Sequence, residues 1–139
     1  MRIEVKNKCP IAASLDLLGD RWTLVVLRDI LLANVYTFSE IGSQEGIATN
    51  ILNNRLEKLV DYGLIGRHPH ATDQRRKMYL PKEPGIELIP VLVDLIIWGD
   101  NNTTARGQKK LAKVLQTDRD TMIKQFEANA RTSARRAFE

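Results

Sequence analysis

Three asparagines lie in a stretch of the chain, Thr49 to Leu59, that has the apolar spacing of an α-helix. Asparagine is a poor helix former, because its amide competes with the backbone for hydrogen bonds. A helical wheel places Asn50, Asn53 and Asn54 away from the apolar face. A carboxamide can donate and accept at once, so it can pair with the N6 and N7 atoms of adenine. The exposed side of this helix is therefore a candidate base-reading surface.

The opposite face of the same helix is apolar, with Leu52, Leu56 and Leu59 next to Val60, and it predicts packing against a core. In an isolated helix, such asparagines are more often ordinary solvated positions. The elements expected on either side of the helix favour base reading, because together they form a helix, a glycine turn, a second helix and a hairpin.

A short helix is expected before this segment, over residues 37–45. Thr37 and Glu40 have the spacing at which two side chains cap a helix start. Gly46 then makes a tight break, and the asparagine-bearing helix should run over residues 49–62 until Gly63 stops it. The two helices form a helix-turn-helix candidate.

The N-terminal part of the chain predicts two further helices. The first is Pro10–Leu18, ended by Gly19, a residue suited to the left-handed position after a helix. Asp20 can cap the second, over residues 21–32, which is apolar on most of its circumference and should lie in the middle of the core. Its core candidates are Trp22, Val25, Val26 and Ile30.

Two short strands follow the candidate helix-turn-helix, over residues 64–69 and 77–80, around the polar loop HATDQRR. A strand pair in this place is a wing. A fifth helix is expected over residues 86–98, where Pro90 should either kink the helix or delay its regular part. The predicted fold class is mainly α with a small β wing, a winged helix-turn-helix with an extra C-terminal helical tail.

Composition limits the protein to one compact domain with extensions, since it has 139 residues of which 43% are hydrophobic. Residues 1–99 hold 12 Lys+Arg against 12 Asp+Glu, whereas residues 100–139 hold 9 against 5, so the net charge of +4 belongs to the tail. We see no signal peptide and no apolar run long enough to span a membrane, which predicts a soluble cytoplasmic protein.

The sequence resembles the HxlR-type winged helix-turn-helix transcriptional regulators from Cys9 to about Gly99. Three segments carry the resemblance: CPIAASLDLLGDRWTLVVLRDILL, TFSEIGSQEGIATNILNNRLEKLVDYGLI and RRKMYLPKEPGIELIPVLVDLIIWG. It implies a DNA-binding domain with dimerisation helices over residues 1–99, and it leaves residues 100–139 as a helical extension with no role carried over. In place of a serine that often caps the fourth helix in this family, the chain has Ala48, so the helix start could shift onto Thr49.

Members of this family are usually homodimers on an inverted-repeat operator in double-stranded DNA, with the fourth helix in the major groove. The resemblance implies that Thr49, Asn50, Asn53 and Asn54 face bases, that Arg55 and Lys58 serve phosphates, and that Arg75, Arg76 and Lys77 belong to the wing. For Arg55, an acid on the Glu57 side of the same helix or on a neighbouring helix is an equally good partner. The wing triplet could be a solvated loop, but a basic tip beside a reading helix favours phosphate contact.

Other functional classes are weaker. No convergent nucleophile, base and electrophile or phosphate-binding glycine loop appears, so we expect neither an enzyme nor a cofactor. His68 and His70 flank a proline but lack further ligands, so we expect no metal site. A winged helix that binds protein remains an alternative, since fold alone does not fix function. The operator, the regulated genes and the direction of regulation are not readable.

The helix over residues 86–98 carries more apolar surface than one small core can bury, which favours a second chain as its cover. In the family, the first helix is the companion surface. The alternative is that the tail folds back: Met122, Phe126, Ala130 and Ala134 recur at spacings of four. Whether the tail supports a dimer or is a solvated helix stays open. The expected dimer residues are Leu15, Leu18, Leu92, Ile96 and Ile97.

Cys9 is the single cysteine and precedes Pro10 at the start of the first helix, where unpaired amides and the helix dipole favour an anion. Lys6 and Lys8 add positive charge nearby. Some members of the resembling family sense oxidants or electrophiles through this cysteine and others do not. Cys9 is therefore a candidate redox sensor, which would make an oxidant or another small molecule the effector. An inert packing residue is the alternative.

Overall fold

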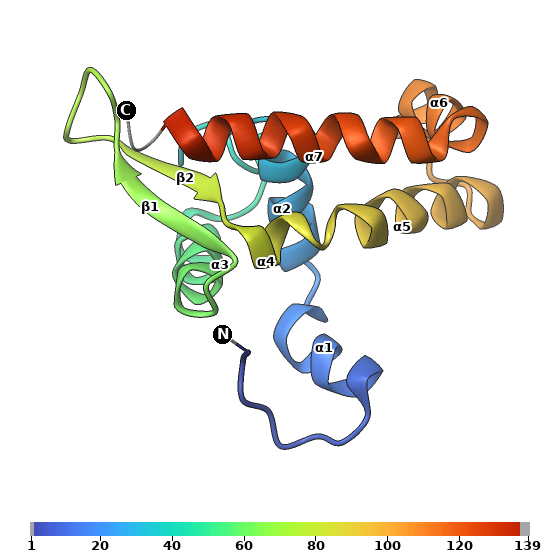
Figure 1. The fold of residues 1–139 in the computed structure, drawn as a ribbon, viewed down its shortest axis with the longest axis horizontal. Coiled ribbons are helices and arrows are strands. Elements are labelled where there is room, and N and C mark those ends of the chain that lie inside the picture. The colour runs from blue at the N-terminus through green and yellow to red at the C-terminus, as the bar shows by residue number, and fades with distance from the viewer. Residues whose placement is uncertain (1, 137–139) are drawn as a thin grey trace.

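The computed structural model describes residues 2–136 of the chain. It is mostly helical, and the described residues form one two-stranded antiparallel sheet that projects from the helical body (Figure 1). The architecture is a winged helix-turn-helix, as predicted from the sequence. In chain order the elements are α1 (Pro10–Leu18), α2 (Thr23–Leu31), α3 (Thr49–Asp61), β1 (Ile65–Pro69), β2 (Lys77–Pro81), α4 (Glu83–Ile86), α5 (Ile89–Asn102), α6 (Lys109–Thr117) and α7 (Arg119–Arg136).

Helix α2 lies at the centre of the core, as its apolar circumference predicts. Val26 and Ile30 are fully buried, which confirms two of the four predicted core positions. Trp22 and Val25 are only half-buried, so the prediction was wrong for them. Trp22 lies at the exposed start of α2, where the guanidinium of Arg21 stacks over its ring at 4.9 Å from the centroid.

Residues 37–46, expected to be mainly a short helix, form a series of turns. The Glu40 amide closes the first turn by donating to the Thr37 carbonyl at 3.1 Å. Gly42 and Gly46 have positive φ values of 71° and 67°, which a right-handed helix cannot accommodate. The Thr37 hydroxyl donates to the Glu40 carboxylate at 2.8 Å, so the capping pair links two side chains of a turn instead of starting a helix.

Side chains of α2 hold this turn segment in place. The Gly42 amide donates to the Asp29 carboxylate at 2.7 Å, and Arg28 bridges Asp29 at 2.9 Å and Glu45 at 3.1 Å. Ile41 adds a buried apolar contact, with 2% of its surface exposed. The segment therefore occupies the place of the first helix of a helix-turn-helix, and it fixes the position at which α3 begins.

Helix α3 has the predicted start and nearly the predicted end. It begins at Thr49 and ends at Asp61, and Gly63 follows with a positive φ of 77°. Ala48 remains the N-cap residue and makes no side-chain cap, so Thr49 does not take over that position. The first amides of α3 consequently lack a capping side chain.

Strands β1 and β2 form the predicted hairpin, with Ile65 opposite Pro81 and Pro69 opposite Lys77. The Tyr79 amide of β2 also donates to the Tyr36 carbonyl at 2.8 Å, beside an isolated bridge between Thr37 and Met78. Tyr79 and Leu80 are buried. The base of the wing is thus anchored to the turn segment and to the core.

Pro90 delays the regular part of the fifth predicted helix, which was one of the two expected outcomes. It lies in the first turn of α5, where a missing amide costs no hydrogen bond. The preceding residues form the short α4, and α5 continues to Asn102. Leu92 and Val93 of α5 are buried in the core of the same chain.

The C-terminal extension folds back over the body of the protein. Helix α7 lies across α2, α4, α5 and β2 (Figure 1). Leu115, Ile123, Phe126 and Ala130 join the core, each with at most 8% of its surface exposed. This is the fold-back alternative, in which residues spaced by four face the body. Residues 137–139 of the predicted extension lie outside the described residues.

Polar contacts hold both ends of α7. Near its start, Arg119 donates to both carboxylate oxygens of Asp94 at 2.7 and 2.9 Å, which lowers the pKa of Asp94 despite partial burial. Near its end, Arg131 binds Glu83 at 2.9 Å. The Tyr36 hydroxyl donates to Ser133 at 2.6 Å, so α7 also contacts the segment that pairs with the wing.

Helix α1 has the predicted bounds but projects away from the rest of the chain (Figure 1). Gly19 after it has a φ of −84°, so the prediction of a left-handed residue was wrong. A side chain is excluded for another reason, because a Cβ at Gly19 would lie 2.3 Å from the Leu15 carbonyl oxygen. The close approach of this glycine to α1 sets the turn into α2.

Candidate nucleic-acid interface

The outer face of α3 is polar and exposed, and its inner face is buried. Leu52, Leu56 and Leu59 have at most 4% of their surface exposed. The exposed residues are Thr49, Asn50, Asn53, Asn54, Glu57, Lys58 and Asp61. The structure therefore brings the four predicted base-facing residues together on one surface of a helix that is anchored in the core.

Arg55 does not face outward with its neighbours. Its Nε donates to Asp20 at 2.9 Å, and its Nη1 donates to the Asn54 side-chain oxygen at 2.6 Å. Only 22% of the Arg55 side chain is exposed. The sequence left open whether Arg55 binds an acid or a phosphate. In the structure it binds an acid, Asp20, which a phosphate would have to displace.

Asp20 joins the start of α2 to the middle of α3. Its carboxylate accepts hydrogen bonds from the Trp22 and Thr23 amides at 2.8 and 3.1 Å, from the Thr23 hydroxyl and from Arg55. Partial burial raises the pKa of Asp20, but these hydrogen bonds outweigh it and lower the pKa to about 2. Asp20 binds amides at the start of α2, as predicted, but α2 begins at Thr23 instead of residue 21, and its N-cap is Trp22. The second role of Asp20, in holding α3, was not visible in the sequence.

The basic triplet lies at the end of the hairpin loop and the start of β2. Arg75, Arg76 and Lys77 are all exposed, and 94% of the Arg75 side chain is accessible. The contact of Arg75 with Asp73 is long, at 3.5 Å, so it restrains the guanidinium little. A cationic wing tip of this kind can approach a phosphate backbone without breaking a buried ion pair.

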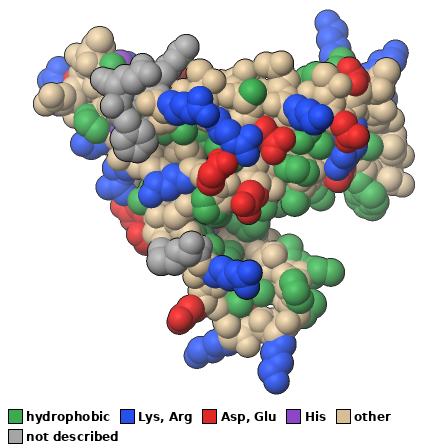
Figure 2. All heavy atoms as spheres, viewed as in Figure 1, with side chains coloured by type: hydrophobic (Ala, Val, Ile, Leu, Met, Phe, Trp, Pro, Cys, Tyr) green, Lys and Arg blue, Asp and Glu red, His purple; other side chains and the backbone are tan. Residues whose placement is uncertain are grey.

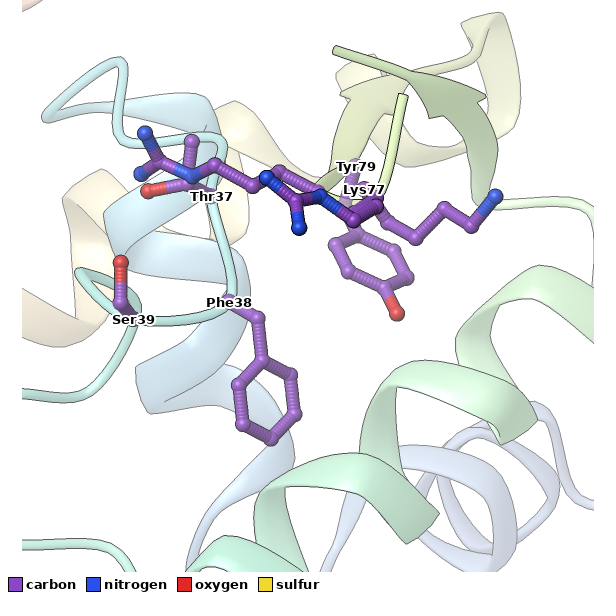
Figure 3. A pocket seen from close by; sticks show the side chains of 7 residues that line it. Thr37, Phe38, Ser39, Lys77 and Tyr79 are labelled. Carbon is purple, nitrogen blue, oxygen red and sulfur yellow. The ribbon is translucent and has the colours of Figure 1, made fainter. Parts of the chain in front are cut away.

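A shallow pocket of about 360 Å³ lies between the wing and the turn segment (Figure 3). The wing triplet and Tyr79 form one side of it, and Thr37, Phe38 and Ser39 form the other. Sequence reasoning missed these last three as neighbours of the wing, because the capping pattern assigned them to a helix start. The signal that could have placed them is the pair of glycines that breaks the segment into turns.

The two histidines of the hairpin, His68 and His70, lie in β1 and directly after it. Within residues 2–136 there is no group of three or more His, Cys, Asp or Glu side chains arranged to hold a metal ion. The His70 ring instead hydrogen bonds to Thr72 at 3.2 Å, within the hairpin loop.

Comparison with known proteins identifies the family. The family model described as "HxlR-like helix-turn-helix" matches residues 17–107, which include α2, α3, both strands and α5. The chain belongs to the HxlR-like helix-turn-helix family. This confirms the family predicted from the sequence, and relatives of the chain are described as HTH-type transcriptional regulators.

An uncharacterized HTH-type transcriptional regulator of Mycobacterium bovis is 37% identical over 90 residues, which are 65% of this chain and 56% of the relative. The chain thus spans little more than half the length of that relative. A second uncharacterized HTH-type regulator, from Synechocystis, is 31% identical over 90 residues, 65% of this chain and 67% of its own.

Solved structures show the same fold. PA1607, described as a candidate transcription factor, is 31% identical, with a TM-score of 0.66 over 73% of this chain and 70% of its own. The redox regulator HypR in its oxidized form is 23% identical, with a TM-score of 0.60 over 70% of this chain and 100% of its own, a likeness that concerns the fold alone.

Part of the HxlR-like chain lies beyond the family match. Helices α6 and α7 follow residue 107, so the match does not describe the fold-back of the extension over the core.

Among the described residues, no helix is both long enough and apolar enough to cross a membrane.

The lowered pKa of Asp20 predicts acid sensitivity. A carboxylate with a pKa of about 2 in the folded state, against an ordinary value of 3.8, stabilises the fold above about pH 4 and loses this contribution between pH 4 and pH 2. Asp20→Asn should reduce the loss of unfolding free energy across that window by up to about 1 kcal/mol, a figure limited by solvent screening. Urea unfolding at pH 5 and pH 2.5 measures it.

The matched control is Asp61→Asn, a change of the same kind at an exposed position of α3. It should leave the acid-induced loss of stability close to that of the wild type. An equal change in both variants would mean that Asp20 has no special part in the folded state.

Proposed function

We propose that this HxlR-like protein is a sequence-specific DNA-binding transcriptional regulator that acts in the cytoplasm as a homodimer on an inverted repeat. The observation that carries the proposal is the exposed polar face of α3, anchored in the core and placed beside a basic wing. In helix-turn-helix proteins the reading helix enters the major groove with its N-terminal half. All four predicted base-facing residues lie in that half of α3.

The residues have different tasks in this account. Thr49, Asn50, Asn53 and Asn54 face base edges, where amide and hydroxyl groups discriminate between bases. Lys58 is exposed on the same helix and serves a phosphate. Arg75, Arg76 and Lys77 bind the phosphate backbone beside the half-site. Arg55, which binds Asp20, orients α3 and is not one of the phosphate ligands.

Site selection from a random duplex library tests the function. The full chain should enrich an inverted repeat whose half-sites lie about one helical turn, or roughly 10 bp, apart, because two copies of α3 must enter successive major grooves. Sequencing of the bound fraction measures this. Enrichment of no sequence over the input library would contradict the proposal.

The wing should contribute affinity without sequence preference. Replacing Arg75 and Arg76 together with alanine should weaken binding to the selected site and to random DNA alike. It should lower the slope of log affinity against log salt by up to about 2, because fewer counterions are released. Fluorescence anisotropy titrations at several salt concentrations measure the slope.

A matched control removes two positive charges from the extension, with Arg106→Ala and Lys110→Ala. Both residues are exposed and lie outside the proposed interface. This variant should keep nearly the wild-type slope. If the wing variant and the control have the same slope, the wing does not touch phosphate.

Two apolar stripes support a homodimer. On α1, Ile11 and Leu15 have 73% and 57% of their surface exposed. On α5, Val91, Leu95 and Trp98 recur at helical spacing with 46%, 48% and 62% exposed. Hydrophobic side chains gather on the surface of both helices (Figure 2). Helix α1 projects away from its own chain, so its stripe is left uncovered there. A second copy of the chain would cover the stripes of both α1 and α5.

The expected dimer residues differ in exposure. Leu15 is exposed, and Leu18, Ile96 and Ile97 are half-buried against the core of their own chain. Leu92 has only 4% of its surface exposed, so it has almost no surface left for a partner. The proposed interface therefore centres on Leu15, Leu95 and Trp98, with the half-buried residues at its edge.

Charge at the centre of this interface should dissociate the dimer. Leu95→Glu places a carboxylate among apolar side chains of the partner and should yield a monomer with weakened binding to the inverted repeat. Light scattering at micromolar concentration measures the mass. Val114→Glu, at a residue of α6 with 47% exposed, is the control and should remain dimeric. A monomeric wild type would contradict the dimer.

Cys9 is the proposed sensing residue. It is exposed at the N-cap of α1, and its amide donates to the Asn7 side chain at 3.2 Å. A peroxide can oxidise the exposed thiol to a sulfenic acid, with water as the other product. Because α1 belongs to the proposed dimer interface, a modification of Cys9 would change the distance between the two copies of α3.

Oxidation should therefore change DNA binding through this one side chain. Treatment with hydrogen peroxide should lower the affinity of the wild type for its selected site by about tenfold or more, and a thiol reductant should restore it. Cys9→Ser should keep its affinity under the same treatment. Anisotropy titrations measure both, and an equal response of the two proteins would leave Cys9 as a structural residue.

A further inference from the structure

The two adjacent asparagines of the α3 outer face have opposite hydrogen-bond partners. The side-chain oxygen of Asn54 accepts from Arg55 Nη1 at 2.6 Å. The side-chain nitrogen of Asn53 instead donates to Glu57 at 3.4 Å, one helical turn further on. One amide thus has its oxygen engaged within the protein, and the other has its nitrogen engaged.

We propose that Arg55 and Glu57 set the base preference of α3 by leaving Asn54 to act as a hydrogen-bond donor and Asn53 as an acceptor. This inference rests on the proposed function and names what its reading helix recognises. A free asparagine can do both at once, which is why it suits adenine. A carbonyl oxygen has two lone pairs and an NH₂ group has two hydrogens, so a neighbour at one end of the amide leaves a single site there and makes the other end the better base contact.

The arrangement around Asn54 is the more strongly held of the two. Arg55 binds Asp20 through Nε and Asn54 through Nη1, and both contacts use the planar fork of one guanidinium. Asp20 is itself fixed by two backbone amides at the start of α2. Because oxygen and nitrogen diverge from the same carbon, an Asn54 oxygen turned toward Arg55 turns the NH₂ group away from it.

This geometry selects bases by their major-groove edges. The NH₂ group of Asn54 fits an acceptor, and guanine has two adjacent acceptors, O6 and N7, whereas cytosine has only a donor. The free oxygen of Asn53 fits a donor, which adenine has at N6 and cytosine at N4. We therefore expect a G·C pair at the position read by Asn54, because guanine has two adjacent acceptors. At the position read by Asn53 the pair should turn its donor, adenine N6 or cytosine N4, toward this helix.

Aspartate is the sharpest probe, because it keeps the shape of asparagine and removes its only donor. Site selection with Asn53→Ala and Asn54→Ala first locates the position that each residue reads. Asn54→Asp should then lose about tenfold of the discrimination at its own position, as Asn54→Ala does. Asn53→Asp should keep its wild-type preference, because it retains the acceptor. Both positions are exposed, and circular dichroism checks that each variant folds.

The two aspartate variants are controls for each other. They add the same charge to adjacent positions, so repulsion from phosphates should lower their general affinity to a similar extent. Base preference at one position is a ratio within one protein, and this repulsion cancels from it. Equal loss of preference in both variants, or an A·T pair at the position read by Asn54, overturns the inference.

Arg55 is a positioning residue in this account, and Arg55→Lys tests it separately. Lysine keeps the charge but has no fork that can bind Asp20 and Asn54 together. The variant should broaden the preference at the Asn54 position alone and keep the wild-type salt slope. An unchanged preference overturns the role of Arg55.

The outcomes separate this inference from the proposed function. If the wild type enriches no sequence, the proposed function fails and this inference fails with it. If the wild type enriches an inverted repeat but Asn54→Ala alters no position, the function stands and the assignment of Asn54 is wrong.

Discussion

The carboxylate of Asp20 joins the two helices on which the candidate interface depends. It accepts hydrogen bonds from the Trp22 and Thr23 amides at the start of α2, and it binds Arg55 in the middle of α3. A reading helix must keep its polar face at a fixed angle to the body of the protein, because base contacts tolerate little displacement. Buried leucines of α3 supply most of the packing energy, but apolar contacts are not directional, and the ion pair adds direction.

A second constraint comes from the C-terminal extension. Helix α7 buries Ile123, Phe126 and Ala130 in the same core as α2, and its ends bind Asp94 of α5 and Glu83 of α4. It thus contacts both the helix proposed for dimerisation and, through Ser133 and Tyr36, the segment that pairs with the wing. In this chain the wing and α5 are held by one long helix beyond the family match.

Sequence patterns correctly predicted the helices and strands whose ends are set by residues close to them in the sequence. Pro10 starts α1, Gly63 ends α3, and the polar loop between two apolar runs gives the hairpin. The prediction failed where distant partners decide. Residues 37–46 form turns because their glycines take positive φ values and Asp29 binds the Gly42 amide.

The same distinction applies to the candidate interface. Helical spacing alone predicted that the asparagines are exposed, because the wheel depends only on residue order. The partner of Arg55 lies 35 residues away in sequence, and no local pattern identifies it. The fold-back of the extension was visible only as an alternative, since spacing shows that α7 has an apolar face but not which surface it covers.

The ratio of two dissociation constants tests the central claim most directly. The full chain should bind its selected inverted repeat at least about 10³ times more tightly than a scrambled duplex of equal length at physiological salt, the range typical of specific DNA-binding proteins. A ratio near 1 would mean that α3 meets DNA only through charge, and that its asparagines do not read bases.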